Sequence, residues 1–499
     1  MEIKYIVIQA GGKGSRLKHL TANKPKGIVP VNNLPMIFHL MKKFNEKKFI
    51  IIADYKHEVI EKYCEVFSPA DYFIINAKEK GTCAGIKQAL DIIPQEEPFM
   101  IIWSDLVVGS KFELPTLYEN MIGISENFQC RWSYKNDTLI EEPSIENGVA
   151  GCFIFKNKSF LGDIPTCGEF VRFLQEKKLD FIPFKLHDVN EVGTLIAYDS
   201  QKTESICRPF NSIEMVEDKV IKKAILPQGE RLAKFEINWY KKISELKYKN
   251  IPKIYSYNPL IMENVKGKNI FKLDLTINEK KTVIANVVNS LKDLHSLGNC
   301  EKDYFSIQEN YYKKTIERIS KVRDLIPFAN DREIIINGKR CKNIFFYKDE
   351  FKKLIEDNLY DTNFTIIHGD CTFSNMLVDN NFCVTLIDPR GYFGDLILYG
   401  DEYYDWAKLY YSINGNYDQF NNKNFVLDIL ENEIKLKINS SGYEELTDYF
   451  LSLIPNCDSK KIEILQAIIW LSLTTYAWED YDSICGAFYN GLLYLNKYL

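Results

Sequence analysis

Three polar residues in the C-terminal half of the chain have the spacing of a site for phosphoryl transfer. Asp370 ends the segment IIHGD, Asn375 follows five residues later, and two apolar runs joined by a polar turn lead to Asp388. Transfer from ATP needs a carboxylate that accepts the proton of the attacking hydroxyl, and an amide and a second carboxylate that hold Mg²⁺ on the nucleotide. The three residues match these roles in that order, so the segment predicts a kinase site. The alternative is three separate loop caps, which leaves the combined spacing unexplained.

A second set of residues near the N-terminus could bind a nucleoside triphosphate. The segment IVIQAGGKGSRL places three glycines directly after an apolar run: Gly11, Gly12 and Gly14. Glycines let the backbone approach phosphate and present N–H groups to it. Arg16 follows this loop, and Lys26 lies ten residues further on, where Pro25 restricts the chain. Two cations would offset the charge that builds on departing pyrophosphate. A tight turn with solvated charges is the alternative interpretation.

Carboxylates for a metal ion follow later in the same half. Asp105 ends the apolar run FMIIWSD, and the carboxyl edge of a sheet is a common place for a Mg²⁺ ligand. A turn-forming aspartate is the alternative. A second ligand is expected from the segment KLHDVNEVGTLIAYD, where Glu191 and Asp188 both remain open.

The N-terminal motifs resemble a known family. GGKGSRLKHLT followed by KPKGIVPV is similar to the signature of the sugar nucleotidyltransferases, which include the phosphocholine cytidylyltransferases, over roughly residues 1–200. The resemblance implies that Lys26 neutralises the transferring phosphate. It also implies nucleotide binding by the loop residues Gly11, Gly12, Gly14, Ser15 and Arg16. Glu191 stands where this family usually has an aspartate, which puts the second metal ligand in doubt.

A further segment resembles the part of that family that contacts the nucleotide base. Gly81 and Thr82 in KEKGTCAGIKQAL match it, and the implied role is binding of the base at the start of a helix. A helix cap would account for the same pair of residues.

The C-terminal motifs resemble the choline kinase and aminoglycoside phosphotransferase family, which has a protein-kinase-like fold, over roughly residues 205–499. The resemblance implies that Asp370 is the catalytic base and that Asn375 and Asp388 are metal ligands. It also implies a hinge in LIMENVKG, where the backbone of Glu263 to Val265 would bind adenine.

This family further requires a strand lysine paired with a helical glutamate. In DKVIKKAIL the strand offers Lys222 and Lys223, whose side chains point to opposite faces, and Glu236 is the natural partner. We favour Lys222 because it shares a face with Val220. An unpaired surface lysine is the alternative.

The segment after Asp388 differs from typical choline kinases and is more similar to kinase halves of bacterial capsule and surface-polysaccharide proteins. It brings two acids and three aromatic residues close together: Asp401, Asp405, Tyr403, Tyr404 and Trp406. These side chains could bind a cationic or hydroxylated acceptor. An amphipathic helix with a packed aromatic face is an equal alternative.

The elements that must position these residues change along the chain. Short apolar strands alternate with helical stretches up to about residue 200, which indicates a mostly parallel, doubly wound sheet. A hairpin-like stretch at 213–224 and long amphipathic helices from about residue 273 follow. Because 499 residues exceed one hydrophobic core, we expect two or three domains, and the change of pattern near residue 200 divides the chain into two. The predicted fold class is α/β: a Rossmann-like nucleotidyltransferase domain, 1–200, then a protein-kinase-like α+β domain, 205–499.

The composition of the chain limits the kinds of molecule that it is expected to bind. A net charge of −5 supplies no basic field for nucleic acid, and no apolar run reaches the length of a membrane span. The N-terminus lacks the pattern of a signal peptide, and the cysteines form no CxxC pair. We therefore expect a cytoplasmic protein with small-molecule substrates, and a homo-oligomer stays open.

Together the two halves predict a bifunctional enzyme that depends on Mg²⁺. In the preferred interpretation ATP phosphorylates an alcohol such as choline or ethanolamine, and CMP from CTP is then joined to the product for surface decoration. The alternative enzyme is an anomeric sugar kinase coupled to a sugar-1-phosphate uridylyltransferase. A third possibility is one working transferase with a degenerate kinase-like regulatory module, against which the complete set Asp370, Asn375 and Asp388 argues.

Overall fold

The computed structural model describes residues 2–116, 119–201, 211–225 and 227–499. The chain divides into two units, which are described separately. The first comprises Met1–Glu204 and Trp478–Asp482, and the second comprises Ser205–Ala477 and Ser483–Leu499.

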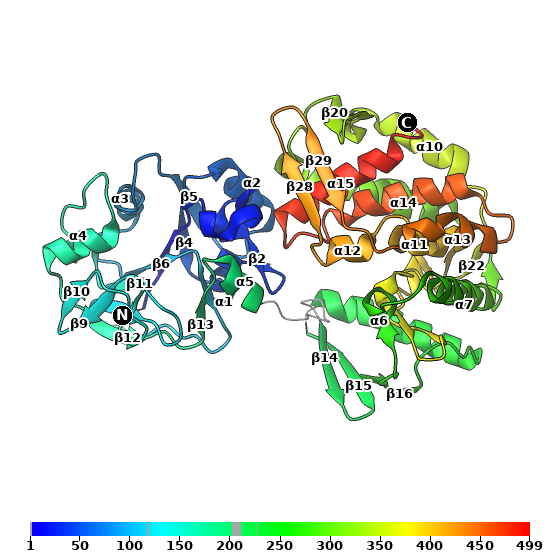
Figure 1. Ribbon diagram of the computed structural model, residues 1–499, viewed down its shortest axis with the longest axis horizontal. Helices are drawn as coiled ribbons and strands as arrows, with labels where there is room; N and C mark the ends of the chain where they lie inside the picture. The colour runs from blue at the N-terminus through cyan, green and yellow to red at the C-terminus, as the bar shows by residue number, and fades with distance from the viewer. Residues whose placement is uncertain (1, 117–118, 202–210, 226) are drawn as a thin grey trace. The chain divides into compact units, whose positions relative to one another are not determined.

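A seven-stranded sheet forms the centre of the first unit (Figure 1). Its order is β12 (Ile182–Lys185), β8 (Met121–Ile124), β11 (Val149–Phe155), β6 (Phe99–Trp103), β1 (Tyr5–Gln9), β4 (Lys48–Ala53) and β5 (Tyr72–Asn76). Most neighbours are parallel, and β11 is antiparallel to both β6 and β8. The helices are α1 (Met36–Lys43), α2 (His57–Phe67), α3 (Cys83–Ile92), α4 (Phe170–Lys177) and α5 (Leu195–Ser200). Short strand pairs are β2 (Pro30–Val31) with β3 (Leu34–Pro35), β7 (Leu106–Val108) with β13 (Val189–Glu191), and β9 (Ser133–Lys135) with β10 (Thr138–Ile140).

The central strands explain where polar residues gather in this unit. Val7, Ile50 and Ile101 of β1, β4 and β6 are buried in one core, as expected for parallel strands covered on both faces. Gln9 pairs with Trp103 at the ends of the parallel strands β1 and β6. Parallel neighbours end at the same edge of a sheet, so the glycine loop after β1 and the acidic residue after β6 emerge together.

The second unit begins with a small antiparallel sheet. Its order is β14 (Asn211–Val216), β15 (Lys219–Ala224), β17 (Leu260–Glu263) and β16 (Ile254–Tyr257), and the helix α6 (Pro227–Glu245) follows β15. Short strands then frame a loop region: β18 (Lys268–Asn269), β19 (Asn299–Cys300), β22 (Phe364–Ile366), β23 (Met376–Val378), β24 (Val384–Leu386), β25 (Tyr392–Phe393), β26 (Leu396–Ile397) and β27 (Tyr399–Asp401). A separate sheet contains β20 (Glu333–Ile336), β21 (Lys339–Lys342), β28 (Phe425–Ile429) and β29 (Ile434–Ile438).

Helices make up the rest of the second unit. They are α7 (Ile277–His295), α8 (Tyr304–Ile307), a π-helical stretch (Gln308–Lys313), α9 (Lys314–Lys321), α10 (Lys348–Leu359), α11 (Glu402–Ile413), α12 (Tyr417–Asn421), α13 (Thr447–Leu453), α14 (Ser459–Leu473) and α15 (Tyr481–Leu495). Figure 1 shows the sheet of β14, β15 and β16 at one end of this unit and α14 and α15 toward the other.

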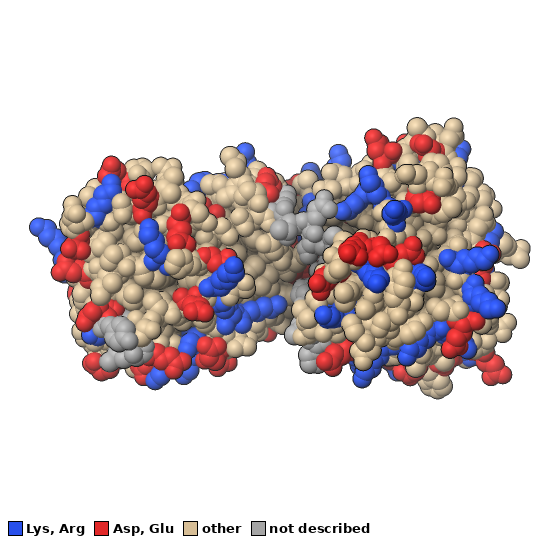
Figure 2. Space-filling model, turned by 90° about the horizontal axis from the view of Figure 1, so that it is seen from below, with Lys and Arg blue, Asp and Glu red and all other residues tan. Residues whose placement is uncertain are grey.

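The predicted fold class is confirmed, with a doubly wound α/β unit followed by an α+β unit. The predicted hairpins are present as β14 with β15 and β23 with β24. None of the described helices is both long and apolar enough to cross a membrane. On the face seen in Figure 2, acidic and basic side chains are intermixed.

Candidate functional sites

The glycine loop after β1 is shaped around Lys26. Gly14 has a φ of +67°, and a Cβ there would lie 2.9 Å from the Cβ of Lys26, so glycine is needed at this position. At Gly12 no described atom lies within 4 Å of the place of a Cβ, which leaves its backbone open to a ligand. Gly11 is buried and Ser15 is exposed. The loop therefore combines a close approach of Lys26 with accessible backbone.

Four of the predicted side chains meet at one point of the first unit. The ammonium group of Lys26 forms an ion pair with Asp105, and Arg16 Nη2 lies 3.8 Å from Glu191 Oε1. A Cβ at Gly193 would lie 2.1 Å from Glu191 Oε1, 2.9 Å from Asp105 Oδ2 and 3.1 Å from Arg16 Nη2. Gly193 is thus a position that sequence reasoning missed, and the GT pair after Glu191 was its signal.

The two open alternatives for the second carboxylate separate in space. Asp188 Oδ2 accepts a hydrogen bond from the Lys111 N–H at 2.8 Å, and so fixes a neighbouring turn. Glu191 lies beside Asp105, and burial and that neighbouring charge raise the pKa of the Glu191 carboxyl. Two adjacent carboxylates supply the hard oxygen ligands that Mg²⁺ prefers, with phosphate oxygens completing its shell.

Gly81 and Thr82 have structural contacts of their own. Gly81 has a φ of +98°, and a Cβ there would lie 2.2 Å from the Gly168 carbonyl oxygen. Thr82 precedes α3, and its hydroxyl oxygen accepts the Phe170 N–H at 2.8 Å. These contacts join the starts of α3 and α4, and they account for both residues without a nucleotide.

The predicted kinase residues come together in the second unit. Asn375 Nδ2 donates to Asp370 Oδ2 at 2.9 Å, and Lys222 Nζ lies 2.9 Å from Asp388 Oδ1. Lys222 Nζ also lies 2.8 Å from Glu236 Oε2. The Ile387 N–H donates to the Asn375 carbonyl oxygen at 3.0 Å, so the loop that carries Asp388 lies against the one that carries Asn375. Strand β15, helix α6 and these two loops therefore bring the polar residues close together.

Of the two candidate lysines, Lys222 makes this contact. Lys222 is half-buried on β15, whereas Lys223 is exposed. Burial raises the pKa of the Glu236 carboxyl to about 7, and the ion pair with Lys222 opposes that shift. The contact between strand and helix is the one that a kinase uses to orient ATP phosphates.

Only part of the predicted hinge has a free backbone donor. The Glu263 N–H donates to the Lys253 carbonyl oxygen at 2.9 Å, and the Asn264 N–H donates to Asp218 O at 2.7 Å. Among the described residues the Val265 N–H has no protein acceptor. Of the three residues of the predicted hinge, Val265 is therefore the one whose N–H is free to donate to a ligand.

Asp401 and Asp405 lie in the core of the second unit. Asp401 caps α11 by accepting the Tyr403 N–H at 2.9 Å. The Asp405 carboxylate accepts hydrogen bonds from two backbone N–H groups, that of His368 at 2.8 Å and that of Gly369 at 2.7 Å. The structure thus favours the packed amphipathic helix over contact of these acids with an acceptor, because both are fully buried.

We expect Asp405→Asn to lower the free energy of unfolding by about 2–3 kcal/mol, because an amide nitrogen would face a buried N–H. Burial raises the pKa of the Asp405 carboxyl, but His295 and His368 outweigh burial and hold it below its usual value. The ionised group therefore stabilises the fold above a pH of about 3.9, and this stabilisation is lost as the pH falls through the folded-state pKa. Denaturant unfolding at several pH values should give a flatter acid limb for the variant.

The exposed Asp428 on β28 gives a matched control. Asp428→Asn should leave both the unfolding midpoint and its acid limb at wild-type values. If Asp405→Asn also unfolds like wild type at neutral pH, Asp405 does not hold the loop.

Lys408 is a site residue that sequence reasoning missed. Its Nζ lies 2.8 Å from Asp370 Oδ1, and it is half-buried on α11. The sequence interpretation of that helix rested on its acids and aromatic residues and did not include its single lysine. The one cation in the helix sequence EYYDWAKLYYSI was the available signal.

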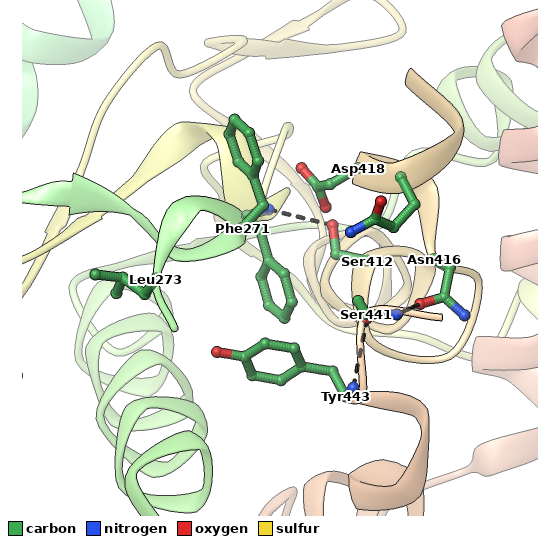
Figure 3. Close-up of a pocket in the computed structure, with 9 residues that line it drawn as sticks. Phe271, Leu273, Ser412, Asn416, Asp418, Ser441 and Tyr443 are labelled. Atoms are coloured by element: carbon green, nitrogen blue, oxygen red, sulfur yellow. Dashed lines mark hydrogen bonds between the residues drawn. The ribbon is translucent and has the colours of Figure 1, made fainter. Parts of the chain in front are cut away.

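A pocket lies beside the start of α12. Its cavity volume is about 40 Å³, and its lining includes Phe271, Ser412, Asp418 and Tyr443. Figure 3 shows Asp418 next to Ser412, with Tyr443 on another side. Burial raises the pKa of the Asp418 carboxyl to about 6, and its Oδ2 has no hydrogen-bond partner among the described residues.

Family comparisons agree with this division of the chain. Residues 5–127 match the family model described as nucleotidyl transferase, and residues 222–427 match that of the phosphotransferase enzyme family. The two matches fall in the first and second units respectively.

Individual relatives are similar to the first unit. The bifunctional protein GlmU of Methanococcus maripaludis (strain C7) is 26% identical over 172 residues, which are 32% of this chain and 41% of that protein. The mannose-1-phosphate guanylyltransferase catalytic subunit beta of Dictyostelium discoideum is 26% identical over 211 residues, which are 39% of this chain and 56% of that protein. The chain thus spans about half the length of these relatives or less. The CTP:phosphocholine cytidylyltransferase structure from Streptococcus pneumoniae is 19% identical with a TM-score of 0.32, and the alignment covers 40% of this chain and 97% of that one.

Proposed function

Because the chain joins a nucleotidyltransferase domain to a phosphotransferase domain, we propose that it makes a nucleotide-activated compound in two steps. The second unit transfers the γ-phosphoryl group of ATP to a hydroxyl of a small acceptor. The first unit couples the resulting phosphate ester to a nucleoside monophosphate. The observation that carries the proposal is that each unit brings together side chains of the types that one of these reactions needs.

In the kinase step the acceptor oxygen bonds to the γ-phosphorus and the bond to the ADP oxygen breaks. Asp370 accepts the hydroxyl proton, as its half-exposed carboxylate allows. Lys222, held by Glu236, orients the ATP phosphates. Asn375 and Asp388 have the oxygen donors that fit Mg²⁺, and the ion would neutralise phosphate charge there.

In the transfer step an oxygen of the new phosphate ester bonds to the α-phosphorus of a nucleoside triphosphate, and pyrophosphate leaves. Lys26 and Arg16 stabilise the charge that develops on the phosphates. Asp105 and Glu191 would hold Mg²⁺ beside Gly193. The backbone around Gly12 and Gly14 would receive the triphosphate.

A sugar is the acceptor that we favour. The relative from Dictyostelium is named for mannose 1-phosphate, and a sugar phosphorylated at its anomeric carbon is the matching nucleophile. The product would be a nucleoside diphosphate sugar. Magnesium, ATP and a second nucleoside triphosphate are then the small molecules that the protein requires.

A cationic alcohol is the second candidate. The pocket near α12 combines the buried Asp418 carboxylate with the aromatic rings of Phe271 and Tyr443, a combination that suits an ammonium group. Choline or ethanolamine would then be phosphorylated and joined to CMP from CTP for decoration of a surface polysaccharide or lipid.

One panel experiment separates these candidates. ADP formation and pyrophosphate release are measured separately with the full chain, Mg²⁺, and CTP, UTP or GTP, against free and phosphorylated sugars, choline and ethanolamine. Pyrophosphate release with a sugar 1-phosphate supports the favoured function. Release with CTP and phosphocholine or phosphoethanolamine replaces it by the second candidate. Absence of both products across the panel would contradict the two-step proposal.

We expect Lys222→Met to lower kcat/KM for ATP by about 10- to 100-fold, since a charged hydrogen bond contributes about 1.5–3 kcal/mol. Lys223→Met is the matched control, because Lys223 is the exposed neighbour on the same strand. The measurement is initial rates of ADP formation, with thermal unfolding to verify folding. Equal loss in the two variants would remove Lys222 from its role.

A further inference from the structure

Four half-buried cationic side chains near Asp370 have no role in the two-step reaction described above. This basic cluster consists of Lys314, Arg318, Arg390 and Lys408. Lys314 and Arg318 are one turn apart on α9, Lys408 is on α11, and Arg390 follows Asp388 by two residues.

Arg390 joins the helices that carry the cluster. Its Nη2 donates to Asn310 Oδ1 at 2.9 Å, and its Nη1 donates to the Tyr404 hydroxyl at 3.0 Å. Lys314 Nζ donates to the same Asn310 oxygen at 3.4 Å. Asn310 is in the π-helical stretch that leads into α9, and Tyr404 is on α11.

The cluster extends to the reacting centre. Lys408 is one turn after Tyr404 on α11, and its Nζ lies 2.8 Å from Asp370 Oδ1. Arg390 packs against the same loop, because its N–H donates to the His368 carbonyl oxygen at 2.8 Å. A group bound at the cluster would therefore lie beside the base that activates the acceptor.

The positive charges of the cluster outnumber the carboxylates that contact it. Among the described residues, Lys314, Arg318 and Arg390 have no carboxylate within 4.0 Å, and only Lys408 has an ion pair, with Asp370. Burial and the neighbouring cations lower the pKa of the Lys314 ammonium group. Half-buried positive charge without a paired carboxylate is costly, so the cluster favours a bound anion.

A second feature beside the basic cluster is a buried hydrogen-bond donor, the Asn310 amide, that no described residue uses. Asn310 is 5% exposed, and its Nδ2 has no partner among the described residues, although its Oδ1 accepts from Arg390. Arg318 is held over the Tyr476 ring, 4.4 Å from its centroid, and donates to Ser472 O at 3.0 Å. Fixed cations and a spare donor are the usual components of a phosphate or carboxylate site.

We propose that the basic cluster binds an acidic group of the kinase acceptor. The acceptor would then be a hydroxylated compound, such as a sugar, that already carries a phosphate or a carboxylate. This inference rests on the proposed kinase step and specifies its substrate class. It excludes choline and ethanolamine, whose ammonium groups the cluster would repel.

The cation assigned to the ATP phosphates, Lys222, is separate from the basic cluster. Lys222 contacts Asp388 and Glu236 on the side of β15 and α6, whereas the basic cluster is carried by α9, α11 and the loop after Asp388. The two sets of cations can therefore be tested through different kinetic constants, the KM for ATP and the KM for the acceptor.

The first experiment compares acceptors with the full chain. ADP formation is measured with hexoses, their 6-phosphates, the corresponding uronic acids and choline. We expect a 6-phosphate or a uronic acid to exceed its parent hexose in kcat/KM by at least about 100-fold, and which of the two is preferred identifies the anion. Equal or better use of neutral hexoses or of choline would overturn the inference.

The second experiment compares two adjacent lysines. Lys314→Met should raise the KM for the acidic acceptor by about 10-fold or more and leave the KM for ATP within about twofold. Lys313→Met is the matched control, because Lys313 is exposed and its partner, Glu309, is 3.6 Å away. A rise in the KM for ATP in Lys314→Met would assign the cluster to the nucleotide instead.

A measurement without turnover keeps the inference separate from the proposed function. Inorganic phosphate should raise the Tm of the wild type and of Lys313→Met, and clearly less that of Lys314→Met. This result without any ADP formation would contradict the kinase step but retain the anion site. Identical shifts in all three proteins would overturn the anion site, whatever the activity.

Discussion

We expect Asp370→Asn to abolish ATP-dependent phosphorylation while pyrophosphate release from a supplied phosphorylated substrate continues. An amide cannot accept the proton of the attacking hydroxyl, and removal of such a base costs about 10²- to 10⁴-fold in rate. The transferase residues Lys26 and Asp105 belong to the other unit, so they have no part in this loss.

The oxygen of an asparagine can still accept the hydrogen bond of Asn375 Nδ2, but Lys408 loses its ion pair with Asp370 Oδ1. A thermal unfolding curve must therefore accompany the rates. The measurement is ADP formation alongside pyrophosphate release on the same preparation. Asp379→Asn, in the turn between β23 and β24, is the control, because its carboxylate contacts only backbone N–H groups of that turn in the described structure. Loss of both activities in a folded Asp370→Asn protein would mean that the two reactions cannot be separated.

Site residues whose positions follow from local geometry, within one loop or along one strand, could be predicted from the sequence. Asp370 and Asn375 lie five residues apart, and their side chains contact each other. The alternation of side chains along a strand favoured Lys222 over Lys223, and Lys222 is the lysine that contacts Glu236. In these cases local geometry limits the answer to one or two positions.

Residues whose contacts depend on distant segments could not be predicted. The choice between Glu191 and Asp188 depends on which one lies beside Asp105, which is decided by the pairing of β7 with β13. Lys408 reaches Asp370 only because α11 packs against the loop that carries Asp370. Spacing along the chain contains no information about either contact.

Burial explains why the acidic pair at the start of α11, Asp401 and Asp405, suggested a different role. Asp401 and Asp405 lie among aromatic residues, a composition that fits both a binding surface and a packed helix. Both carboxylates are fully buried. The hydrogen bond that Asp401 accepts fixes the start of α11, and the one that Asp405 accepts from His368 fixes the loop before Asp370. A carboxylate that satisfies buried donors is costly to remove, which is a structural reason for an acid at this position.

We expect Lys26→Ala to lower the rate of pyrophosphate release by about 10²- to 10³-fold and to leave ADP formation unchanged. Lys26 is the cation that Gly14 admits into the loop and that pairs with Asp105, so it is positioned to stabilise charge on the transferring phosphate. Loss of a preorganised donor at a developing charge has an effect of this size.

The same variant tests whether Lys26 acts through charge or through packing. Lys26→Ala also leaves Asp105 beside Glu191 without its ion pair, so a thermal unfolding curve must accompany the rates. Lys62→Ala, on the exposed side of α2, is the control for removal of a lysine. If Lys26→Arg recovers pyrophosphate release, the positive charge is sufficient, and if it does not, the ammonium group must fit the space beside Gly14. Equal damage to ADP formation would contradict two independent sites, since every contact assigned to Lys26 lies within the first unit.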